Sequence, residues 1–167
     1  MSIILNIILI VLVYVLQTTL MPVISLWGIT PNLVFIFVIC FAMFNGREKG
    51  MIMALAMGLL LDMLTTYQFG LVTVLMTTAA VLTTTVFARV FSPNISTALV
   101  SVGVCNLGYN LLLVLGMSLF GQGHPIFYDF FRIILPEAIY NMLLTFPIFL
   151  LLDQLCRSGA LDWTKTP

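Results

Sequence analysis

The chain has 167 residues, of which 62% are hydrophobic and 7% are charged, and its mean hydropathy is +1.20. Soluble domains carry about 25% charged residues, so the composition excludes an ordinary soluble protein and indicates an integral membrane protein. The six basic and six acidic residues balance, which leaves no basic stripe for nucleic acid.

The apolar stretches predict an all-α protein with six transmembrane helices, separated by loops rich in glycine, proline and polar residues. The first covers about residues 3–20, and we expect it to be a retained anchor because no cleavage site follows its apolar run. The other five are expected at about residues 32–45, 50–64, 71–88, 96–120 and 134–153. Residues 1–167 would then form a single transmembrane domain.

The basic residues predict the orientation of these helices. Cytoplasmic loops carry an excess of Lys and Arg. If both termini are cytoplasmic, Arg132 is the one basic residue outside, and those inside are Arg47, Lys49, Arg89, Arg157 and Lys165. The sequence therefore predicts an N-in, C-in protein.

Small residues recur at every fourth position before an acidic residue. Gly46, Gly50, Ala54 and Gly58 precede Asp62 at this spacing. Residues four apart share a helix face, and small residues let transmembrane helices approach closely. We expect a helix-packing row that ends in a carboxylate facing protein rather than lipid. The row could pack within the chain or receive a partner's helix.

Other polar side chains also fall inside apolar helices, where an unpaired amide is costly. The intramembrane polar set comprises Gln17, Asp62, Asn106, Asn110, Glu137 and Asn141. The favoured interpretation is hydrogen bonding between helices, and the alternative is a ligand cavity or a proton path. We expect Asp62 and Glu137 to lie toward the outer side.

Residues 126–135 combine aromatic side chains with charge. This composition fits a short helix lying in the membrane interface, or simply the beginning of the last transmembrane helix. The candidate contact residues there are Phe127, Tyr128, Phe130, Phe131 and Arg132.

Catalytic and metal-binding motifs are absent from the sequence. His124 stands alone, and Cys40, Cys105 and Cys156 are scattered, so we expect no metal and no cofactor. A membrane enzyme would need Asp62 or Glu137 as its base, and this class is the least favoured.

Short motifs follow one another in a specific order between residues 16 and 71. They are Leu-Gln-Thr-Thr-Leu at 16–20, Pro22, Gly28, Pro-Asn-Leu at 31–33, Gly-Arg at 46–47, Gly50, Gly-Leu-Leu-Leu-Asp at 58–62 and Gly-Leu at 70–71. This order resembles the rod shape-determining protein MreD family of bacteria. Beyond residue 71 the resemblance rests on length, the number of helices and Tyr140-Asn141.

The resemblance implies a non-enzymatic, multi-pass scaffold of the bacterial cytoplasmic (inner) membrane, within the complex that synthesises peptidoglycan during cell-wall elongation. It implies MreC as the main partner, and a wider complex with MreB, RodA and its transpeptidase. It also implies a fold similar to the substrate-binding subunits of energy-coupling-factor transporters. With this resemblance, we expect the contact residues Phe127 to Arg132 to meet MreC near the membrane surface, with an ordinary interfacial anchor as the alternative.

A second function class remains open, namely a membrane subunit that binds a small molecule for a transporter. Its cavity would be lined by Gln17, Asn106, Asn110, Glu137 and Asn141. A co-purifying pair of ATPases would favour the transporter, whereas co-purifying MreC would favour the scaffold.

Overall fold

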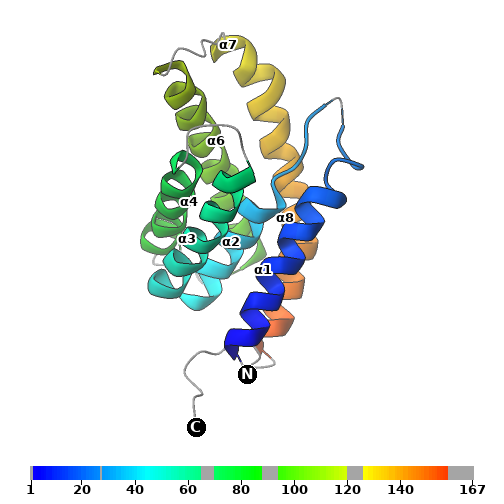
Figure 1. Cartoon of the computed structure of the whole chain (residues 1–167), viewed down its shortest axis with the longest axis vertical. Coiled ribbons are helices and arrows are strands. Elements are labelled where there is room, and N and C mark those ends of the chain that lie inside the picture. Colours follow the sequence, from blue (N-terminus) through cyan, green and yellow to red (C-terminus); the bar gives the residue numbers. More distant parts are fainter. Residues whose placement is uncertain (1, 27, 65–69, 88–93, 120–125, 158–167) are drawn as a thin grey trace.

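The computed structural model describes residues 2–26, 28–64, 70–87, 94–119 and 126–157, which form an all-helical bundle (Figure 1). The elements in chain order are α1 (Ser2–Thr19), α2 (Leu33–Asn45), α3 (Arg47–Leu64), α4 (Leu71–Leu82), η1 (Thr83–Phe87), α6 (Ile95–Leu119), α7 (Ile126–Asp129), η2 (Phe130–Ile134) and α8 (Leu135–Arg157). Each of the six predicted helical segments is helical in these residues. The third helix begins three residues earlier than predicted and the last continues beyond residue 153.

Helix α2 is the centre of the bundle. It contacts α1, α3, α4, α6 and α8, and residues 34–42 are almost completely buried. Its sequence is apolar on every side, as expected of a helix enclosed by other helices. With 13 residues it is about 20 Å long. The 20–32 connection, described for residues 20–26 and 28–32, joins α1 to α2.

The ends of α2 are set by two residues. The Asn32 side chain accepts a 2.9 Å hydrogen bond from the Phe35 amide and caps the first turn. Gly46 follows the last turn with a φ of +84°, a conformation that favours glycine. Gly46 therefore lies outside α3, and the prediction that it belongs to the helix-packing row is wrong.

Two π-helical turns, η1 and η2, interrupt the regular helices within the described residues. Pro136 has no N–H with which to continue the α-helical ladder, and just before it the Leu135 amide donates to the Phe130 carbonyl, five residues back. In η1 the hydroxyls of Thr83, Thr84 and Thr85 bond to carbonyls four residues earlier. Such bonds compete with the helical ladder and bend helices.

Residues 126–157 form one continuous helical stretch through α7, η2 and α8. The structure therefore favours the second interpretation of residues 126–135, in which they begin the last helix. In Figure 1, α6 and this stretch rise above the ends of the shorter α2, α3 and α4. The beginning of α1 and the end of α8 lie together at the opposite end of the bundle.

Two helical stretches of the described residues are long and apolar enough to cross a membrane. They are Ile95–Ser118, with 24 residues, and Phe130–Arg157, with 28 residues. Shorter apolar helices cover Asn6–Thr19, Leu33–Asn45 and Leu71–Phe87.

Candidate functional site: the buried polar side chains and the exposed aromatic segment

The structure divides the intramembrane polar set into three groups. Asp62 lies between α3 and α4, and Gln17 lies between α1 and the 20–32 connection. Asn106 and Asn110 of α6 lie with Glu137 and Asn141 of α8. Asp62 is therefore separate from the rest, whereas Asn141 links the Gln17 group to the Glu137 group, because it binds the Asn32 amide between the two residues that Gln17 binds.

Asp62 caps helix α4. Its carboxylate accepts hydrogen bonds from the Val72 amide at 3.2 Å and the Thr73 amide at 2.9 Å, and a further one from the Thr73 hydroxyl. The side chain is 3% exposed. Amides at a helix N-terminus lack partners within the helix, and the helix dipole favours a negative charge there. The carboxylate thus has a structural function at a buried helix end.

Gln17 and Asn141 bind the backbone of the 20–32 connection near the start of α2. The Gln17 amide donates to the Pro31 carbonyl at 3.2 Å and accepts from the Leu33 amide at 2.7 Å. Asn141 Oδ1 accepts from the Asn32 amide at 2.9 Å. These bonds satisfy backbone groups that irregular chain would otherwise leave unpaired inside a bundle.

Tyr140 adds a contact that sequence reasoning missed. Its hydroxyl donates a 2.6 Å hydrogen bond to the Ile24 carbonyl, which lies 116 residues earlier. The one available signal was the residue type, because a tyrosine within an apolar helix usually finds a partner for its hydroxyl. Helices α1 and α8 therefore hold the 20–32 connection from two sides.

The third group surrounds the carboxylate of Glu137. The side chains of Asn110, Asn106 and Asn141 interact with it, and Asn141 Nδ2 lies 3.4 Å from Glu137 Oε1. Asn110 Nδ2 also donates to Asn106 Oδ1 at 3.2 Å. Asn106 is fully buried, and its Nδ2 has no hydrogen bond of regular geometry. This group joins α6 to α8 and offers amide donors beside a carboxylate.

The small-residue row of α3 packs against helices on both sides. A Cβ atom at Gly50 would lie 2.5 Å from Cβ of Ala42 in α2, and one at Gly58 would lie 2.7 Å from Cα of Thr73 in α4. Ala54 between them is fully buried. The row is thus occupied within the chain, which leaves no room there for a partner's helix.

The aromatic segment precedes α8 and is largely exposed. Phe131 is 67% and Tyr128 is 53% exposed. The Arg132 guanidinium carbon lies 5.1 Å from the centroid of the Tyr128 ring, within the range of a cation–π contact. The rings of Phe130 and Phe131 meet edge to face at 5.3 Å, and the side chain of Phe127 lies outside the described residues.

No group of His, Cys, Asp and Glu suited to a metal ion occurs in the described part of the chain. The arrangement can hold helices together and present an aromatic surface, and Glu137 with its amides forms a polar cluster between α6 and α8.

The comparisons with known proteins agree with the resemblance seen in the sequence. No curated protein and no solved structure matched the chain. The model of the family described as rod shape-determining protein MreD matches residues 1–158. Since this match covers nearly the whole chain, the protein belongs to the MreD family of membrane-associated, rod shape-determining proteins.

Proposed function

We propose that this protein is a non-enzymatic membrane scaffold of the bacterial cell-wall elongation complex, which binds MreC and helps to maintain rod shape. The match to the MreD family over residues 1–158 is the observation that carries the proposal. In this proposal the wider complex contains MreB, RodA and its transpeptidase.

The use of the buried polar groups supports a scaffold. The Asp62 carboxylate caps α4, and Gln17 and Asn141 bind backbone groups around the start of α2. A catalytic base needs reach to a substrate proton, whereas the Asp62 oxygens already accept hydrogen bonds from α4. These side chains therefore serve the shape of the bundle.

The proposed membrane placement has six transmembrane helices and both termini in the cytoplasm. Helix α8, with 23 residues, is about 35 Å long and matches a hydrocarbon core of about 30 Å. Arg132 then lies near the outer surface, and Arg47 and Arg157 lie inside, as the excess of positive charge in cytoplasmic loops requires.

The proposed MreC contact is the aromatic segment at the start of the last helix. Exposed aromatic residues and arginine are enriched at protein interfaces, and Tyr128, Phe131 and Arg132 are exposed together. The small-residue row is the weaker candidate, because α2 and α4 already occupy it.

A pull-down tests this proposal. The tagged protein is purified from its native membrane in mild detergent, and MreC is quantified for the wild type, a Phe131→Ala, Arg132→Gln variant and the control Leu151→Ala. Leu151 is 60% exposed on the same helix but lies far from the segment. We expect the control to retain MreC and the double variant to lose it, and equal MreC in both would refute this contact. An absence of MreC from the wild type would refute the scaffold itself.

One observation favours the second candidate, a substrate-binding subunit of a small-molecule transporter. The amide side chains of Asn106 and Asn110 lie beside the Glu137 carboxylate between α6 and α8, and such groups can bind a polar ligand. Recovery of a pair of ATPases in the same pull-down would support this candidate. The similarity to energy-coupling-factor subunits stays a prediction.

A further inference from the structure

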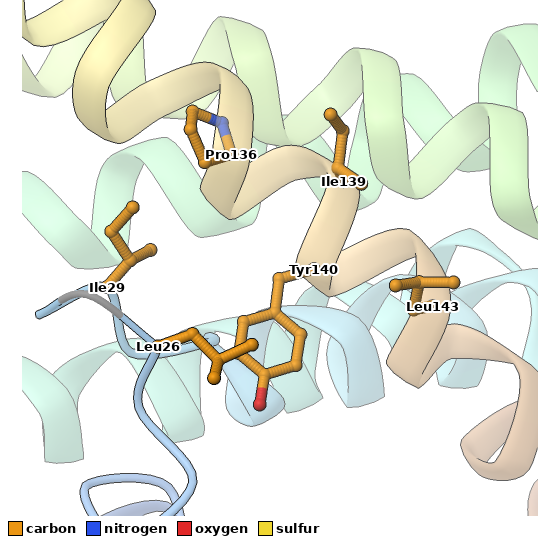
Figure 2. Close-up of a pocket in the computed structure, with 6 residues that line it drawn as sticks. All are labelled: Leu26, Ile29, Pro136, Ile139, Tyr140 and Leu143. Atoms are coloured by element: carbon orange, nitrogen blue, oxygen red, sulfur yellow. The ribbon is translucent and has the colours of Figure 1, made fainter.

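An apolar groove separates the 20–32 connection from α8. Figure 2 shows Leu26 and Ile29 of the connection facing α8, and the groove has a volume of about 300 Å³. Its α8 side is lined by Pro136, Ile139, Tyr140 and Leu143. Leu26 and Leu143 are 59% and 69% exposed, so the groove opens at the surface of the bundle.

The walls of the groove are held in place by bonds already described. Leu26 and Ile29 exchange backbone hydrogen bonds of 3.2 Å and 2.9 Å in a tight turn around Gly28, whose φ is +83°. The Tyr140 hydroxyl donates its proton to the Ile24 carbonyl, which holds the Tyr140 ring in place at the groove. The groove is therefore preformed and apolar, which favours an apolar ligand.

A cation precedes the groove residues along the last helical stretch. Arg132 is exposed and precedes Pro136 by about one helical turn. In its contact with Tyr128, the Arg132 guanidinium lies over the face of the tyrosine ring. The N–H donors at the edge of the guanidinium, which bind phosphate, are therefore not used by this contact. A ligand with a phosphate next to a long apolar chain would match both features.

The groove is narrow, with a volume of about 300 Å³, and it follows α8 from Pro136 to Leu143. A flexible acyl chain can lie along such a groove, and its headgroup would then extend toward Arg132.

We propose that this groove binds one acyl chain of an anionic phospholipid, whose phosphate is bound by Arg132. The proposal rests on the membrane placement given under the proposed function, in which the start of α8 lies at the headgroup level. The lipid then fills the space between the 20–32 connection and the last helix.

Native mass spectrometry of the purified full chain with dioleoyl-phosphatidylglycerol tests the proposal. The Ile139→Trp variant fills the groove, and Val100→Trp is its control because Val100 is a similarly exposed, β-branched residue of α6, 51% against 54%. Arg132→Gln removes the cation, and Arg157→Gln at the far end of α8 is its control. Because no partner protein is present, the result is independent of whether MreC is bound.

We expect one phosphatidylglycerol to remain on the wild type and on both controls. Ile139→Trp should abolish its retention, and Arg132→Gln should weaken it about tenfold, the loss expected for one charge-assisted contact. Equal retention in all variants would overturn the proposal, and so would loss in the control variants. Dimers of the chain without lipid, lost in Ile139→Trp, would identify a second copy as the occupant instead and would also overturn it.

Discussion

The short helices α2, α3 and α4 and the long helices α6 and α8 are built in different ways. In the first region backbones touch at Gly50 and Gly58, and a buried carboxylate caps a helix. In the second region helices meet through amide side chains, while large apolar residues remain exposed in both regions, such as Met63 in α3 and Leu143 in α8. We therefore expect substitutions to destabilise the short-helix region most, and we propose the start of the last helical stretch as the contact surface.

The largest effect is expected from a side chain inserted into the short-helix region. Gly58→Leu would press against the backbone of Thr73, since even a Cβ atom would lie 2.7 Å from its Cα. Overpacking costs about 1–3 kcal/mol or more, and we expect loss of folded protein in size-exclusion chromatography. The control is Gly108→Ala in α6, where a Cβ atom meets nothing within 4 Å and helix propensity favours alanine. An equal yield for both variants would contradict the division into two regions.

The next largest effect is expected at the cap of α4. Asp62→Leu leaves the Val72 and Thr73 amides without acceptors in a buried place, and each unsatisfied group costs about 1–3 kcal/mol. We expect a lower melting temperature and failure to rescue rod shape in cells that lack the protein. Asp62→Asn keeps one acceptor, so its melting temperature should lie between those of the wild type and Asp62→Leu. Asp153→Asn, in an exposed pair with Arg157, should change the melting temperature little.

A smaller effect is expected where the 20–32 connection meets α8. Tyr140→Phe removes the hydrogen bond to the Ile24 carbonyl and should cost about 1 kcal/mol. Because the lost bond is local, hydrogen exchange should increase in residues 20–32 and remain unchanged in α3. Tyr128→Phe is the control, since Tyr128 is 53% exposed. If hydrogen exchange in residues 20–32 is the same in Tyr140→Phe as in the wild type, other bonds suffice to hold the connection.

The smallest effect on stability is expected in the aromatic segment. Phe131 is 67% exposed, and surface substitutions usually change stability by less than about 0.5 kcal/mol. The Phe131→Ala variant should therefore have the same melting temperature as the wild type, although it should no longer retain MreC in the pull-down. A large fall in melting temperature would assign the segment to the stable region and remove the contrast between the two.

The helix positions were predictable because apolar runs and their breaks are local properties of the chain. The spacing of Gly50, Gly58 and Asp62 likewise indicated a helix face that packs against protein. In the structure these residues are buried against α2 and α4. Gly46 was misassigned because spacing alone does not distinguish a residue in a helix from the glycine that ends the preceding one.

The partners of the polar groups could not be predicted in the same way. Asn141 binds the backbone of Asn32 across 109 residues, and Tyr140 binds Ile24 across 116. Such pairs depend on how helices distant in sequence are arranged, and periodicity within one helix carries no information about it. The sequence favoured hydrogen bonds between helices over a ligand cavity for this polar set, but it did not show which groups pair; in the fold Asp62 binds α4 apart from the others.

The hydrogen bond between Asn141 and the Asn32 amide also has a consequence for biosynthesis. A chain is made from its N-terminus, so α1 and α2 emerge long before α8 exists. Until then the Asn32 amide and the Ile24 carbonyl lack their final partners. We therefore expect the connection between α1 and α2 to reach its final conformation only after α8 has been synthesised and has packed against it.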